Sequence, residues 1–75
     1  MKTLNDLKDG QKAIVGELKP TLAACRRLME LGLMPGVEVR FIKSAPLGDP
    51  IAVDIEGRHL SLRREDAAQI SVTIQ

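Results

Sequence analysis

Aromatic side chains are nearly absent from this chain of 75 residues, which has no tryptophan, no tyrosine and a single phenylalanine, Phe41. Proteins that bind single-stranded nucleic acid usually stack bases on exposed aromatic rings. The composition therefore disfavours that class of protein. It also requires an aliphatic core built from leucine, isoleucine, valine and methionine.

An excess of charge of either sign is missing as well. The sequence has 11 basic and 10 acidic residues and a formal net charge of +1. Proteins that wrap duplex nucleic acid normally carry a clear basic excess, because they neutralise phosphates. A binder of that kind is disfavoured, although a small local patch of charge remains compatible with the composition.

Long apolar runs and paired cysteines are also lacking. Cys25 is the single cysteine, so no disulfide can form within the chain. No window approaches the roughly 20 apolar residues of a membrane-spanning helix, and the first residues lack the apolar core of a secretory signal. We therefore expect a reduced, cytoplasmic setting.

The segment Arg27–Gly36 is the most informative part of the sequence. An amphipathic helix runs into Gly32, which suits the positive φ that commonly ends a helix, and Leu33 can then pack back on the last turn. Pro35–Gly36 suits the two central positions of a type II turn. The segment predicts how one short helix joins a set of strands.

Three elements are expected to begin before that segment. Thr3 can cap a short turn over residues 4–7, and Thr21 can cap a helix over residues 22–31. The apolar side of this helix is expected to contain Leu22, Ala24, Cys25, Leu28, Met29 and Leu31. Residues 11–18 read as a strand, whose inward side chains are either Ala13 and Val15 or Ile14, Gly16 and Leu18.

After Gly36 the apolar pattern changes to a period of two, which is typical of strands with one buried face. The alternating segments are 37–41, 51–55, 59–63 and 70–74. Glu56–Gly57 is a plausible two-residue hairpin turn. It would pair Ile55 with Arg58 and Asp54 with His59, and this register places the apolar side chains of both strands on one face.

These elements predict an all-β domain with a small helical content. We expect a small SH3-like barrel of about five strands, with one inserted short helix and a single helical turn over residues 64–68 before the last strand. One domain should span residues 1–75, since a chain of this size supports a single core. The short open edges of such a barrel make weak self-association conceivable.

The chain resembles the ferrous iron transport protein A (FeoA) family. The matching residues are Leu4, Leu7 and Gly10, followed by the segments 27–36, 45–50 and 62–70. The resemblance implies a small accessory protein of bacterial ferrous iron uptake. It also implies a partner, the FeoB-like membrane permease with a cytosolic GTPase domain, and contact with the membrane only through that partner.

No active site is evident in the sequence. A catalytic dyad needs a nucleophile and a base, and the chain offers one histidine and one cysteine. Cys25 lies on the apolar side of its helix and is best read as a small buried hydrophobe. Asp54 and His59 would make a weak metal site, and we interpret them as an exposed cross-strand ion pair. We predict no catalytic, metal or cofactor site.

Partner binding is the better hypothesis, and the helix supplies most of its candidates. Arg26, Arg27 and Glu30 lie on the polar side, where the alternative is a solvated face with an Arg26–Glu30 pair. Leu33 and Met34 follow the helix, and their alternative is a role in capping the core.

Leu47 is the apolar candidate outside the helix, at the expected tip of a loop. Its side chain either contacts a partner or folds back over the end of the barrel. Two functions stay open: an accessory module that docks on the permease, and a small-barrel nucleic-acid-binding protein of the translation-associated kind. Charge balance and the scarcity of aromatic residues favour the first.

Overall fold

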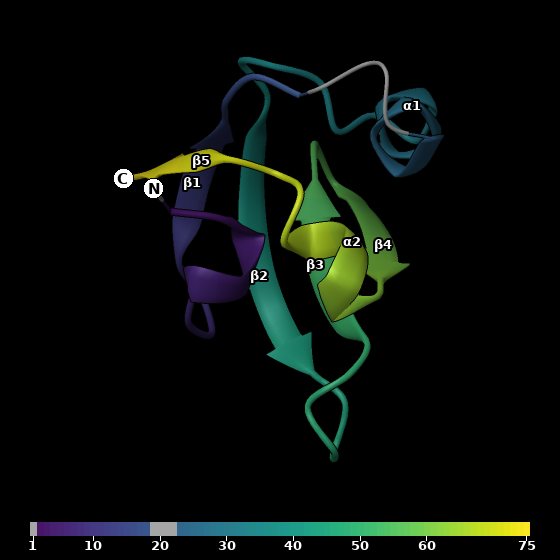
Figure 1. The fold of residues 1–75 in the computed structure, drawn as a ribbon. Coiled ribbons are helices and arrows are strands. Elements are labelled where there is room, and N and C mark those ends of the chain that lie inside the picture. Colours follow the sequence, from purple (N-terminus) through teal and green to yellow (C-terminus); the bar gives the residue numbers. More distant parts are fainter. Residues whose placement is uncertain (1, 19–22) are drawn as a thin grey trace.

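The computed structural model describes residues 2–18 and 23–75, and in this part of the chain one five-stranded antiparallel sheet carries three short helical segments (Figure 1). In chain order the elements are the 3-10 helix η1 Leu4–Asp6, β1 Lys12–Val15, α1 Ala23–Glu30, β2 Glu38–Ser44, β3 Ile51–Ile55, β4 Arg58–Leu62, α2 Arg64–Ala67 and β5 Val72–Ile74. The strand order is β4-β3-β2-β1-β5. This architecture confirms the predicted mostly-β fold with an inserted helix and a helical turn before the last strand.

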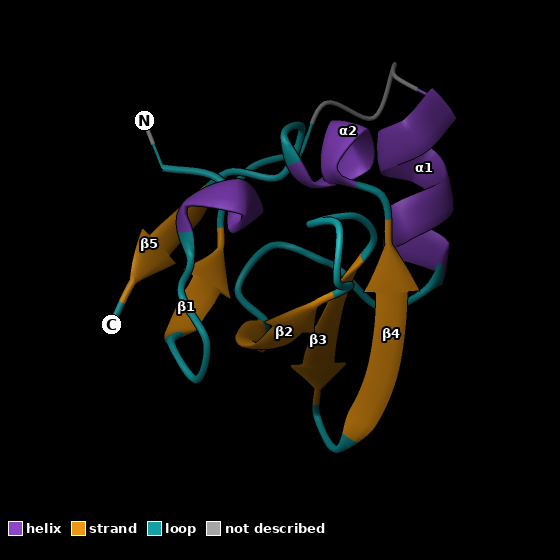
Figure 2. Ribbon diagram, turned by 90° about the horizontal axis from the view of Figure 1, so that it is seen from below, coloured by secondary structure: helices purple, strands orange, loops and turns teal. Residues whose placement is uncertain are grey.

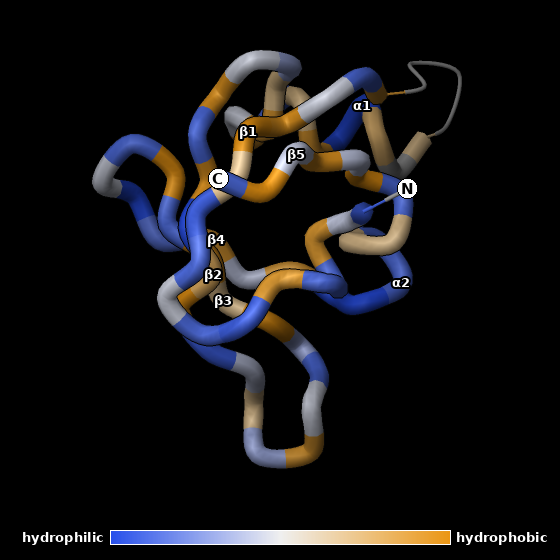
Figure 3. The backbone as a smooth tube through the Cα atoms, turned by 90° about the vertical axis from the view of Figure 1, so that its left-hand side faces the viewer, coloured by the Kyte–Doolittle hydropathy of each residue, from blue (hydrophilic) through white to orange (hydrophobic). Residues whose placement is uncertain are grey.

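The sheet is strongly curved, and its concave face holds an aliphatic core. Apolar and polar positions alternate along the chain (Figure 3), as in β3, where every second residue is buried. Phe41 contributes the one aromatic ring of the core. The buried side chains in the described part are Leu4, Leu7, Ala13, Val15, Leu18, Cys25, Leu28, Leu33, Val39, Phe41, Ile51, Val53, Ile55, Leu62, Ala67, Ile70 and Val72.

Of the two alternatives for the inward face of β1, the structure shows the one with Ala13 and Val15. Ala13 and Val15 point into the core, with 0% and 2% of their surface exposed. Leu18 is also buried, although it was grouped with the alternative set of Ile14 and Gly16. The strand ends at Val15, earlier than the predicted residue 18, so the alternation of faces no longer applies at Leu18.

The hairpin of β3 and β4 has the predicted register. Ile55 lies opposite Arg58 and Asp54 lies opposite His59. Glu56 and Gly57 both have positive φ, +52° and +86°. Positive φ at both central residues defines the type I′ turn, whose twist matches that of the flanking strands. Local turn chemistry and the apolar pattern thus specify the same pairing.

The end of α1 also agrees with the prediction. Gly32 has φ of +108°. Its amide donates to the carbonyl of Met29 at 3.0 Å, and the amide of Leu33 donates to that of Leu28 at 3.0 Å. These two hydrogen bonds define a Schellman motif, which satisfies carbonyls that the helix end leaves free. A further backbone hydrogen bond closes the predicted turn at Pro35–Gly36.

Helix α1 lies beside α2 at one end of the sheet (Figure 2). Cys25 and Leu28 are buried, as expected for the apolar side of the helix. Leu31 was assigned to the same side, and this assignment is wrong, because 43% of its surface is exposed. The predicted cap and two predicted face positions lie outside the described residues: Thr21, Leu22 and the side chain of Ala24.

Candidate interaction surfaces

The polar side of α1 is exposed, but its ion pairing differs from the expectation. The described residues contain no Arg26–Glu30 pair within 4.0 Å. Arg27 instead donates from Nη2 to Oδ2 of Asp66 at 3.3 Å, and the Asp66 side chain is only 17% exposed. This contact connects α1 to α2 and leaves Arg26 free to meet a partner.

Leu33 does not belong to the exposed surface. Its side chain is 0% exposed, because the Schellman motif turns the residue after Gly32 back onto the core. Its assignment as a partner-binding residue is therefore wrong, and its alternative role in capping the core is confirmed. Met34, one residue further on, is 48% exposed and remains a candidate.

Two residues that sequence reasoning missed lie next to these candidates. Leu31 is exposed because it is the last residue before the chain leaves the helix axis at Gly32. Arg58 extends from the start of β4, and its Nη2 donates to the carbonyl of Leu31 at 3.3 Å. The predicted hairpin register could have indicated the exposure of Arg58. It places Arg58 opposite the buried Ile55, and a charged side chain on that face has to extend past the edge of the core to reach water.

We call this set of side chains the α1 surface. It combines exposed apolar groups with arginines, a composition that is common where proteins bind one another. Its members are Arg26, Arg27, Glu30, Leu31, Met34 and Arg58.

Leu47 lies elsewhere. It is 98% exposed, so the alternative in which it folds back over the barrel is wrong. The loop of residues 45–50 projects from the far end of β2 and β3, away from α1 (Figures 1 and 3). Leu47 and the helix therefore do not form one surface, because the seven-residue strand β2 carries the loop to the opposite end.

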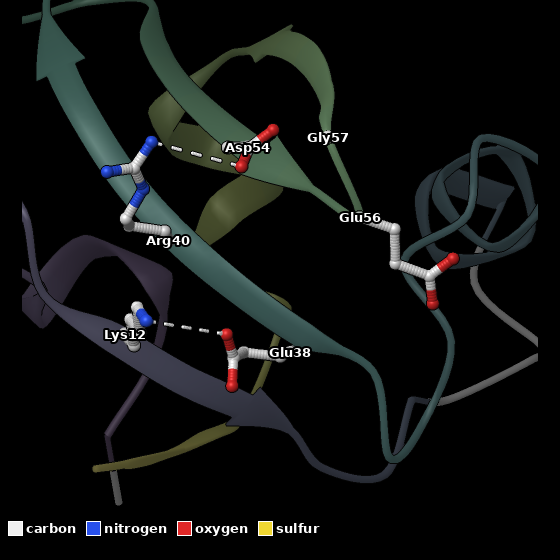
Figure 4. Close-up of a pocket in the computed structure, with 6 residues that line it drawn as sticks. All are labelled: Lys12, Glu38, Arg40, Asp54, Glu56 and Gly57. Carbon is white, nitrogen blue, oxygen red and sulfur yellow. Dashed lines mark ion pairs between the residues drawn. The ribbon is translucent and has the colours of Figure 1, made fainter.

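The outer face of the sheet forms a third surface, a groove of about 340 Å³ lined by Lys12, Glu38, Arg40, Asp54, Glu56 and Gly57 (Figure 4). Lys12 Nζ lies 4.0 Å from Glu38 Oε1, and Arg40 Nη2 lies 3.9 Å from Asp54 Oδ2. Cations and anions therefore neutralise one another across neighbouring strands. The groove lacks the unbroken basic stripe on which nucleic-acid binding depends.

The expected ion pair between Asp54 and His59 is not formed. The register places them opposite each other, but the carboxylate of Asp54 turns toward Arg40, and no His59 pair within 4.0 Å exists in the described residues. Cys25 is 0% exposed, with Sγ 3.9 Å from the carbonyl oxygen of Gln69. Within residues 2–18 and 23–75 no group of three or more histidine, cysteine, aspartate or glutamate residues is placed to hold a metal ion.

None of the helices in the described residues is both long enough and apolar enough to cross a bilayer.

Comparison with solved structures defines the class of protein first. The FeoA of Stenotrophomonas maltophilia, solved in complex with zinc and described as a prokaryotic SH3 domain protein, superposes with a TM-score of 0.79 at 33% identity, over 96% of this chain and 89% of that one. The FeoA protein of Chlorobium tepidum superposes with a TM-score of 0.88 at 42% identity, over 97% of this chain and 70% of that one. The predicted SH3-like fold is thereby confirmed.

A match to the FeoA domain family extends over residues 2–74, and the chain belongs to this family. In Porphyromonas gingivalis a relative is the Fe(2+) transport protein A/Fe(2+) transporter FeoB fusion protein, which is 34% identical over 71 residues. The match covers 95% of this chain and 8% of that protein. The chain thus corresponds to a small part of a much longer relative.

Proposed function

We propose that this chain is a non-catalytic accessory protein of ferrous iron uptake that docks on the cytosolic, GTPase-containing part of a FeoB-like permease. One observation carries the proposal: a relative at 34% identity joins this kind of domain to FeoB in one polypeptide. Fusion holds two domains at a high effective concentration, and it is useful when the separate proteins work together. Residues 1–75 act as one domain in this proposal, in the cytoplasm, with the membrane contacted only through the permease.

The α1 surface supports the docking half of the proposal. Leu31 and Met34 are 43% and 48% exposed, and burying them against a partner would remove apolar area from water. Arg58 lies beside Leu31 and Arg26 is exposed on the polar side of α1, and arginine is enriched in protein interfaces because it combines charge with a planar, multiply donating group. An acidic, partly apolar region of the permease would complement this surface.

The proposal is tested by titrating the purified chain against the isolated cytosolic region of the permease, in the GTP-analogue-bound and nucleotide-free states. We expect saturable one-to-one binding and a change in the rate of GTP hydrolysis. Absence of binding to either state, with both proteins folded, would contradict the proposal.

The nucleic-acid alternative is checked in the same preparation by gel shift with RNA and with single-stranded DNA at moderate salt. We expect no shift, because basic and acidic side chains alternate over the outer face of the sheet. A specific shift at moderate salt would favour the alternative function.

A further inference from the structure

We propose that the loop of residues 45–50 is a preformed knob that inserts Leu47 into an apolar pocket of the permease's cytosolic region, and that Arg64 is the residue that positions it. This inference rests on the docking proposed above and adds a second contact, separate from the α1 surface. Leu47 is 98% exposed, more than any other large apolar side chain in the described residues.

An exposed leucine alone is unremarkable on a protein surface, but this one stands on a loop that is held in shape. The amide of Gly48 donates to the carbonyl of Ala45 at 2.7 Å, and the amide of Ala45 donates to that of Pro50 at 2.9 Å. The loop is therefore closed by its own backbone. Leu47 is held at the tip between these closing contacts.

Arg64 fixes the same loop from outside. Its Nε donates to the carbonyl of Gly48 at 2.6 Å, and its backbone amide donates to Oδ1 of Asp49 at 3.0 Å. Asn5 holds Arg64 in turn, donating from Nδ2 to the carbonyl of Arg64 at 2.9 Å and accepting from Nη1 at 3.4 Å. Residues 48 and 49, which follow Leu47, are thus tied to α2 and η1.

A loop fixed in this way loses little conformational entropy when it binds, so more of the contact energy of Leu47 appears as affinity. The occupant follows from the shape of the feature. A single leucine at a narrow tip is complementary to a pocket, whereas stable attachment to a lipid surface needs several apolar anchors or a cluster of cations.

The charge beside the tip indicates what should surround that pocket. Arg63 borders a hollow with Asp49 and Pro50. Within the described ranges neither Arg63 nor Arg64 has a carboxylate within 4.0 Å of its guanidinium group. The partner's pocket should therefore carry an acidic side chain at the rim that faces Arg63.

The experiment measures binding of the cytosolic region of the permease to four forms of the chain: wild type, Leu47→Asp, Leu47→Met and Thr73→Asp. Leu47→Asp should reduce the affinity at least about tenfold, mainly through faster dissociation. Leu47→Met keeps an apolar side chain of similar volume and should bind within about threefold of wild type. Thr73→Asp, an equal charge change at an exposed site on β5, is the matched control and should bind like wild type.

A double-mutant cycle isolates the role of Arg64. Arg64→Gln should weaken binding in the wild-type background and have no further effect in the Leu47→Asp background, because it acts through the position of Leu47. Thermal unfolding of each variant separates this effect from a loss of folding. An equal effect of Arg64→Gln in both backgrounds would overturn the positioning role.

The remaining outcomes are distinct. If wild type binds and Leu47→Asp binds equally well, the knob is overturned while the proposed function stands. If wild type does not bind at all, the docking itself is overturned, and the knob with it. Binding of wild type to vesicles of phosphatidylcholine and phosphatidylglycerol that Leu47→Asp abolishes would replace the protein pocket by a lipid surface and overturn the inference.

Discussion

Gly32 ends α1 in a backbone conformation that residues with a Cβ atom adopt only with strain, since its φ is +108°. A Cβ atom there would also meet the guanidinium end of Arg58, which is the tip of a flexible side chain and would have to move aside. The same arginine donates to the carbonyl of Leu31. One glycine therefore allows both the helix end and the approach of β4 to it.

We expect Gly32→Val to lower the free energy of unfolding by about 1–3 kcal/mol, the usual cost of a β-branched residue held at positive φ. Urea unfolding followed by circular dichroism measures the loss. Gly10→Val is the matched control, because Gly10 has φ of +84° but open space around its Cβ position. A smaller loss at Gly10, and partial rescue of Gly32→Val by Arg58→Ala, would show the steric share of the cost. An unchanged midpoint for Gly32→Val would contradict the strain.

Single residues were predictable where local chemistry decides their conformation, and not where a distant partner does. Gly32 and Leu33 follow from the rules of helix ends, and both are placed as those rules require. The partner of Arg27 could not be predicted, because Asp66 lies 39 positions away in the chain. The exposure of Leu31 was missed because the helical period was continued one residue too far.

At the scale of elements, η1 shows how a three-residue helix is secured by its cap. Oγ1 of Thr3 accepts from the amide of Asn5 at 3.2 Å, and Oδ2 of Asp6 accepts from the amide of Thr3 at 2.8 Å. The adjoining amide of Leu4 donates to the carbonyl of Ile70 at 3.1 Å. The cap thus lies where the N-terminal segment pairs with residues 70–72, at the start of β5.

Thr3→Val removes the capping oxygen and keeps the shape of the side chain, and we expect it to cost about 1 kcal/mol. Hydrogen exchange should accelerate at the amides of Leu4 and Val72, since both bond across this junction. Thr73→Val makes the same chemical change at an exposed strand position without a cap and should leave both quantities nearly unchanged. Equal behaviour of the two variants would contradict the capping role.

The elements themselves were largely evident in the sequence. The β3–β4 register agrees at every predicted pair, because a two-residue turn and a strict alternation leave one arrangement. Strand β2 was less predictable: it runs to Ser44, beyond the predicted residue 41, through a register shift between Phe41 and Lys43. A β-bulge inserts an extra residue into a strand, and an alternating apolar pattern does not predict it.

At the scale of the whole molecule, the placement of the surfaces depends on the curvature of the sheet. Leu47 is exposed, and its loop of residues 45–50 lies at the opposite end of the molecule from α1 (Figure 1). Which loops share an end is decided by strand length and coiling, which are properties of the folded sheet. The exposure of most candidate residues was therefore predictable one by one, while their grouping in space was not.

Iron binding is a second property of the whole molecule. We expect the purified chain to bind Fe²⁺ no better than a generic protein surface, because Cys25 is buried and Asp54 is turned toward Arg40. Asp54 on β3 and His59 on β4 would be only two ligands, which make a weak metal site. Anaerobic calorimetry with wild type and His59→Ala tests this expectation. Stoichiometric, micromolar binding that His59→Ala abolishes would contradict it.

Charge on the α1 surface should affect the rate of docking. Arg26→Glu should slow association with the cytosolic region of the permease several-fold and reduce its dependence on salt, because exposed charges steer the encounter. Lys8→Glu, the same charge change at an exposed residue between η1 and β1, is the control and should leave the rate nearly unchanged. If both variants associate equally slowly, the net charge of the chain, and not the α1 surface, sets the association rate.

Arg27 requires a different design, since Arg27→Glu alone would also place a negative charge against Asp66. The swap Arg27→Glu with Asp66→Arg restores the ion pair with its polarity reversed and so preserves the link between α1 and α2. If Arg27 contacts the permease, the swapped chain should unfold like wild type and still bind more weakly. If Arg27 only connects the helices, the swapped chain should bind like wild type, and the docking contact of α1 would reduce to Arg26, Glu30, Leu31, Met34 and Arg58.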